Sequence, residues 1–218
     1  MEELEPDDLA VHPGLPRVVA LVAALNAGYF AIEFAVALAI GSVALFADSV
    51  DFLEDAAVNL LVLLALRWPA RRRAVVGALL AALLLAPSLG TLWVAWRKVM
   101  LPVAPAPVPL GLTGLGALAI NFGCAMMLLR WREARGSLTR GAFLSARNDT
   151  IANLAIIVAA AVTAVYPSPW PDVVVGLGIF AMNLTAAKEI GEAAHRERRE
   201  GRTALPRAGQ VAARSERE

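Results

Sequence analysis

The chain of 218 residues is 58% hydrophobic and only 18% charged, and its mean hydropathy is +0.61. This composition excludes an ordinary soluble globular protein, and because the apolar residues come in long runs it indicates an integral membrane protein. The single cysteine, Cys124, excludes a disulfide framework and a cysteine-based metal site. The net charge is only +1, because acidic residues at the N-terminal end offset arginines at the C-terminal end.

Six apolar stretches have about the length needed to cross a bilayer, whose hydrocarbon core of about 30 Å takes roughly 20 helical residues. Turns rich in glycine, proline or arginine separate them. The stretches are 16–40, 43–66, 74–96, 110–129, 142–165 and 172–190. We therefore predict an all-α integral membrane protein with a six-transmembrane-helix bundle over residues 16–190. An acidic tail, 1–15, precedes the bundle, and a charged tail that we expect to be disordered, 191–218, follows it.

The first stretch has no basic region before it and no small-residue cleavage pattern soon after it, so we expect a retained span and not a signal peptide. Asn26, Tyr29 and Glu33 share one face of this helix, at spacings of three and four. We expect Glu33 to stay protonated and to hydrogen-bond to a neighbour rather than to bind a metal directly. A role in proton transfer or in conformational change is left open.

The second stretch carries four carboxylates, Asp48, Asp51, Glu54 and Asp55, inside an otherwise apolar sequence. A charged side chain at the centre of a bilayer costs roughly 2.5 to 3.5 kcal/mol even on the lenient insertion scale, so this group needs a functional reason. At about 100° per residue, the three aspartates and Asn59 fall within a stripe of roughly 80°, and Glu54 lies about 60° beyond its edge. The stripe favours an ion site over simple helix–helix hydrogen bonding.

The fifth stretch supplies a matching face. Ser145, Asp149 and Asn153 lie on one side of this helix, whereas Arg147 points roughly 160° away from Asp149. We prefer an interpretation in which Arg147 extends to the cytoplasmic surface, and a salt bridge to Glu54 is the alternative.

Lysine and arginine placement indicates the orientation. If the N-terminus is cytoplasmic, nearly all of the basic residues outside the spans are cytoplasmic, and only Arg97 and Lys98 lie outside. We therefore expect both termini in the cytoplasm and a multi-pass protein of the bacterial cytoplasmic (inner) membrane.

Three carboxylates and a hydroxyl or amide oxygen from two helices make an all-oxygen set suited to a divalent cation. The predicted metal ligands are Asp51, Asp55, Ser145 and Asp149. Without a metal the buried anions would repel one another, and at least one would take up a proton. Metal entry would displace that proton, because carboxylates bind in the ionised form. This gives a physical basis for metal/proton exchange.

Two motifs carry a family resemblance, "GSVALFADSVDFLED" with the preceding "NAGYFAIEF", and "SARND" in the fifth stretch. They resemble the cation diffusion facilitator (cation efflux) family of divalent-metal/proton antiporters, over the transmembrane part only. In that family the second and fifth helices each supply an H/D-x-x-x-D pair, which here reads Asp51-x-x-x-Asp55 and Ser145-x-x-x-Asp149. The resemblance implies a homodimeric exporter of a transition metal (Zn, Mn, Co, Cd or Fe) from the cytoplasm, with protons as the counter-ion.

The sequence departs from the family pattern in two ways. Ser145 stands where the family usually has histidine, and an oxygen-only set favours either a harder ion such as Mn²⁺ over zinc or a loose selectivity among ions. The usual cytoplasmic α/β domain is not expected, because residues 191–218 are too few and too polar to bury a core. Dimerisation would then involve membrane helices. The candidate rows of small residues are Gly77, Ala78, Ala81 and Ala82, or Gly176 and Gly178, although packing within one chain is the preferred interpretation of such rows.

Other functions remain open at this point. A non-transporting membrane metal sensor or scaffold could use the same acidic site, and an intramembrane aspartyl protease could use Asp51 or Asp55 with Asp149. A protease gives no reason for the additional Asp48. We expect no enzymatic activity, no permanent cofactor and no nucleic-acid partner; the expected partners are a divalent metal ion, the lipid bilayer and a second copy of the chain.

Overall fold

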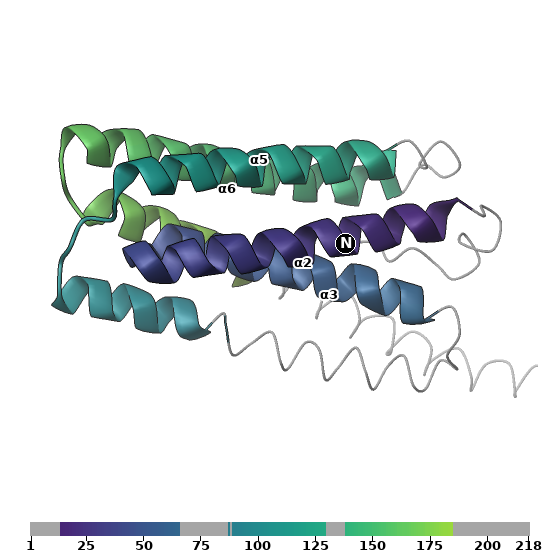
Figure 1. Cartoon of the computed structure of the whole chain (residues 1–218), viewed down its shortest axis with the longest axis horizontal. Helices are drawn as coiled ribbons and strands as arrows, with labels where there is room; N and C mark the ends of the chain where they lie inside the picture. Colours follow the sequence, from purple (N-terminus) through teal and green to yellow (C-terminus); the bar gives the residue numbers. More distant parts are fainter. Residues whose placement is uncertain (1–13, 66–86, 88, 130–137, 185–218) are drawn as a thin grey trace, which may run out of the picture. The chain divides into compact units, whose positions relative to one another are not determined.

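The computed structural model describes residues 14–65, 87, 89–129 and 138–184 (Figure 1). The described part of the chain contains helices and turns and no strand. Its helices are α2 (Leu15–Ile40), α3 (Val43–Ala65), a helix whose described part is 89–100, α5 (Pro107–Leu129), α6 (Leu138–Val165) and the helix Trp170–Leu184. The chain divides into two compact units, Met1–Phe180 and Ala181–Glu218, and the description below concerns the first. The prediction of an all-α chain is confirmed.

The helices follow the predicted spans with shifted ends. α5 begins at Pro107, three residues earlier than expected, because proline suits the first turn of a helix. α6 begins at Leu138, four residues early, since helical hydrogen bonding continues into polar sequence that hydropathy excludes. The third helix continues to residue 100. Several predicted parts lie outside the described residues. They are the rest of the third predicted span with its row Gly77, Ala78, Ala81 and Ala82, residues 185–190 of the last predicted span, and nearly all of the two predicted tails.

A tight turn makes α2 and α3 antiparallel neighbours. Gly41 adopts the left-handed conformation (φ 63°, ψ 39°), which glycine enters without steric cost, and it ends α2. The Ser42 amide then donates to the Ala37 carbonyl at 2.9 Å. The Ser42 hydroxyl accepts a hydrogen bond from the Leu45 amide at 3.1 Å and so caps the start of α3.

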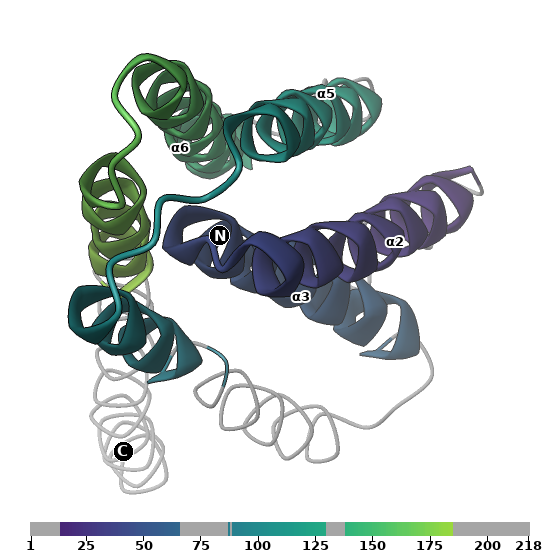
Figure 2. The same ribbon diagram turned by 60° about the vertical axis from the view of Figure 1, so that its left-hand side comes forward.

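Two tightly packed helix pairs enclose the interior: α2 with α3, and α5 with α6 (Figures 1 and 2). Small residues allow close approach of α5 to its neighbours. A Cβ added at Gly114 would lie 2.8 Å from Ile156 Cγ2 on α6. Between the pairs, the Tyr29 hydroxyl of α2 donates to the Thr113 carbonyl of α5 at 2.5 Å. In contrast, α3 meets α5 and α6 over only a few residues.

The distribution of polar side chains is that of a membrane protein. Large apolar side chains such as Ile32, Leu112 and Val158 are more than half exposed on the outer faces, whereas Asn26 and Glu33 of α2 are buried. In the part of the chain that the structure describes, three helical stretches are long and apolar enough to cross a membrane, Pro16–Ile40, Pro107–Leu129 and Asn148–Val165. α3 is as long as α5 but carries the four carboxylates. Its polar groups therefore have to face protein or water and not lipid.

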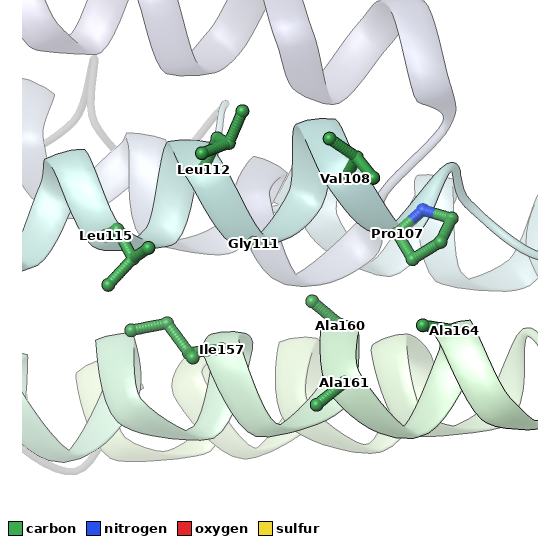
Figure 3. Close-up of a pocket in the computed structure, with 9 residues that line it drawn as sticks. All are labelled: Pro107, Val108, Gly111, Leu112, Leu115, Ile157, Ala160, Ala161 and Ala164. Carbon is green, nitrogen blue, oxygen red and sulfur yellow. The ribbon is translucent and has the colours of Figure 1, made fainter.

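An apolar groove of about 300 Å³ lies between α5 and α6 (Figure 3). Pro107, Leu112, Ile157 and Ala160 are among its lining residues, all of which are apolar. Because these side chains offer no oxygen, nitrogen or sulfur ligand, the groove is not a metal site.

Gly176 provides a test of the helix packing. A Cβ added there would lie 2.7 Å from the Val43 carbonyl carbon and 2.8 Å from the Ala44 nitrogen, whereas a Cβ at Gly178 meets nothing within 4 Å. We expect Gly176→Ala to destabilise the protein by about 1 to 3 kcal/mol, because backbone atoms cannot move aside easily. Thermal unfolding followed by size-exclusion chromatography should show a lower midpoint for Gly176→Ala than for the control, Gly178→Ala. Equal midpoints would contradict this packing.

Candidate metal site

Asp48, Asp51 and Asp55 lie on one face of α3, as the helical period predicts, and Glu54 lies beyond the edge of that face. Asp48 is buried, with a relative exposure of 1%, and Asp51, Glu54 and Asp55 are half-buried. The Gly41 turn and the Ser42 cap fix the residue at which α3 begins, and this determines the side of the helix on which each carboxylate lies. The helix thus presents a column of oxygen ligands toward the interior.

Asp149 of α6 lies near this column. Its carboxyl group interacts electrostatically with those of Asp55 and Asp48, and Asp51 interacts in the same way with Asp149. These electrostatic interactions connect the three predicted aspartate ligands across two helices that are far apart along the chain. Asp149 is half-buried, like Asp51 and Asp55.

These groups do not form a closed cage in the conformation described. Among the described residues, no group of three or more Asp, Glu, His or Cys side chains is close enough to hold a metal ion. Oxygen ligands of a divalent cation lie at about 2.0 to 2.6 Å, a much shorter range than electrostatic interaction. The fourth predicted ligand, the side chain of Ser145, lies outside the described part of α6, as does that of Arg147. The ligand set stays a prediction.

Two asparagines each lie one turn beyond a predicted aspartate ligand on the same helix. The Asn59 side-chain amide donates to the Asp55 carbonyl at 2.8 Å, and the Asn153 amide donates to the Asp149 carbonyl, also at 2.8 Å. Asn153 is fully buried, and its Oδ1 has no hydrogen-bond partner among the described residues. An amide oxygen is a good ligand for a hard cation, so Asn153 can supplement the aspartates.

Glu33 extends the acidic group onto α2. It is fully buried, interacts directly with Asp48, and neither of its carboxyl oxygens has another hydrogen-bond partner among the described residues. The sequence placed Glu33 on a polar face of its helix but could not identify its neighbour. Two carboxyl groups in a low-dielectric interior repel each other when both are charged, so a cation or a proton near this pair lowers its energetic cost.

The family model described as the cation efflux transmembrane domain matches residues 19–194. The chain belongs to the cation efflux family. The match covers α2 to the helix Trp170–Leu184 and confirms the family that the two motifs indicated. Comparison with curated proteins gives no match.

Membership makes this cation efflux protein an integral membrane protein that transports metal cations. Members of the family are transporters and not enzymes. The metal ion is thus a substrate, and the lipid bilayer is the surroundings of the apolar outer faces described above.

One structurally prominent residue was missed by the sequence analysis. Asp172, the first residue of the last predicted span, is fully buried and accepts hydrogen bonds from the start of α3. The available signal was a carboxylate at the very beginning of an apolar helix, directly after a proline-rich loop. That signal does not reveal the partner, because α3 begins more than a hundred residues earlier in the chain.

Proposed function

We propose that this cation efflux protein is a divalent metal cation/proton antiporter that exports a transition metal from the cytoplasm. Asp51 and Asp55 of α3 and Ser145 and Asp149 of α6 bind the metal. The observation that carries the proposal is the electrostatic proximity of Asp149 to the aspartates of α3 inside a membrane-spanning chain. The three aspartates of α3 and Asp149 are costly inside a membrane unless a cation compensates their charge.

The donor set favours a hard or borderline cation. Carboxylate, hydroxyl and amide oxygens suit Mn²⁺, whereas Zn²⁺ is commonly bound by imidazole or thiolate. The two histidines of the chain, His12 and His195, lie in the predicted tails, and Cys124 on α5 is the single cysteine. We therefore infer Mn²⁺ as the preferred ion, with Zn²⁺, Co²⁺, Cd²⁺ and Fe²⁺ as competitors.

Proton coupling follows from the same crowding of carboxyl groups. When the metal leaves, the aspartates and the Glu33–Asp48 pair lose their compensating charge and take up protons. When a metal enters, its ligands have to be ionised, and the protons leave. Metal and protons thus compete for one group of oxygens, which is the basis of an exchange cycle.

The remaining parts of the proposal concern the assembly. The arginine distribution supports cytoplasmic termini in a bacterial cytoplasmic membrane, and family membership supports a homodimer. Gly176 is occupied by contacts with α3 within one chain, so it does not contribute to such a dimer. Residues 16–190 form the transport unit in this proposal, with 1–15 and 191–218 as tails.

Transport into liposomes tests the function. Purified protein in liposomes with an imposed pH gradient should move Mn²⁺ faster than the other four ions. Asp55→Asn and Asp149→Asn should reduce flux to that of protein-free liposomes, because each removes an ionised ligand. Glu54→Gln is the matched control: it removes a carboxylate next to Asp55 but off the stripe, and it should retain transport.

The result also separates the alternatives. Metal binding without flux in folded protein would favour a sensor or scaffold, and pH-independent flux would exclude antiport. Equal loss of flux in Glu54→Gln and Asp55→Asn would contradict the assigned ligand set.

The identity of residue 145 predicts selectivity. We expect Ser145→His to raise the ratio of Zn²⁺ to Mn²⁺ transport by roughly tenfold, because imidazole is a better ligand for zinc than a hydroxyl group. Initial rates with the two ions, measured separately on the same liposomes, give this ratio. Thr150→His, with the new imidazole next to Asp149 on the same helix but 100° around it, serves as the control. An unchanged ratio in Ser145→His would exclude residue 145 from the metal site.

A further inference from the structure

A second buried group of polar and charged residues lies where the α2–α3 turn, the end of helix 89–100 and the start of the helix Trp170–Leu184 meet. Its members are Ser42, Lys98 and Asp172, with relative exposures of 0%, 7% and 0%. It is separate from the metal carboxylates: Asp51 is about 11 Å further along α3 than Ala44, at roughly 1.5 Å per residue. The transport mechanism above assigns no role to these three residues.

Asp172 binds the start of α3. Its carboxylate accepts hydrogen bonds from the Ser42 hydroxyl at 2.5 Å, the Val43 amide at 2.8 Å and the Ala44 amide at 3.2 Å. The first amides of a helix have no partner within the helix, and the positive end of the helix dipole attracts an anion. One side chain of the last helix thus satisfies the free end of the helix that carries Asp51 and Asp55.

Lys98 adds helix 89–100 to this connection. Its ammonium group donates to the Gly41 carbonyl at 2.5 Å and lies 3.8 Å from Asp172 Oδ2. The Gly41 carbonyl is at the end of α2, where a helix favours a cation. The pair Lys98–Asp172 therefore joins the end of helix 89–100 to the end of α2, the start of α3 and the start of the last helix.

Apolar packing surrounds the ion pair. Val43, Ala95 and Val173 form one buried cluster, with one residue from each of α3, helix 89–100 and the last helix. Gly176 allows the last helix to cross the backbone of α3 closely. Hydrophobic residues could replace a buried ion pair at little or no loss of stability, so stability alone does not explain it. A polar connection has the advantage that it can be separated and re-formed when water enters.

We propose that Asp172 and Lys98 form a latch that holds this end of the bundle closed and that opens when this end of the transport path opens. Asp172 then separates from the amides of α3, and the cluster of Val43, Ala95 and Val173 becomes accessible to water. The latch rests on the proposed function only in treating the chain as a transporter that opens at its two ends in turn. It does not depend on which ion is carried.

Thiol labelling tests the latch without any metal. The background is Cys124→Ala, which removes the single cysteine, with Ala95→Cys as reporter in the apolar cluster. A membrane-impermeant maleimide is applied from each side of liposomes in turn. Slow labelling is expected while the latch is intact. Lys98→Met and Asp172→Asn should each raise the labelling rate from one side by roughly tenfold or more, because the closed end opens more often.

The control is Arg97→Met, which removes an exposed positive charge next to Lys98 and should leave the rate unchanged. If both latch variants fail to fold, Ser42→Ala provides the test. This variant keeps both charges and removes one hydrogen-bond donor to Asp172, so it should raise the labelling rate several-fold. Unchanged labelling in folded latch variants, or an equal rise in Arg97→Met, would overturn the proposal. Fast labelling in latch variants of a protein that moves no metal would refute the proposed function and leave the latch intact.

Discussion

The cost of carboxylates inside a membrane is the constraint on which the rest of this structure depends. Asp48, Asp51, Glu54 and Asp55 sit on one helix, and Glu33 and Asp149 approach them from α2 and α6. Lipid cannot solvate these groups, so the helices around them have to keep lipid out, and a cation or protons have to compensate the charge. The apolar outer faces and the burial of polar side chains such as Asn26, Glu33 and Asp48 agree with this requirement. In the proposed function, transport is the release of that compensating charge on one side of the membrane and its renewal on the other.

The helix pairs are packed more closely within themselves than the two helices that carry the proposed ligands are packed against each other. α2 packs on α3 and α5 packs on α6 closely, with Gly114 against Ile156 as an example. The proposed ligands come from α3 and α6, which share only a small contact. A rearrangement between the two pairs can thus change the distance between Asp55 and Asp149 without disrupting either pair. The open spacing of the carboxylates in the described conformation is consistent with such a change.

Much of the fold could be predicted because a bilayer imposes a length and an apolar composition on each helix. The helical period also placed Asp51 and Asp55 on one face and Asp149 toward a partner. Contacts between helices could not be predicted from length, composition and helical period. Periodicity put Glu33 on a polar face but not beside Asp48, and it gave no indication that Asp172 binds the amides of Val43 and Ala44. Such contacts depend on how helices cross, which no local pattern encodes.

Locating the bound ion is the most direct test of the proposed metal site between α3 and α6. Crystals of the protein grown with Mn²⁺ would give an anomalous difference map at a wavelength where manganese scatters strongly. The account predicts one principal peak between α3 and α6, within coordination distance of carboxylate oxygens of Asp51, Asp55 and Asp149, and its loss in Asp149→Asn. A peak at the Glu33–Asp48 pair alone, or in the tail near His195, with none between α3 and α6, would contradict the account.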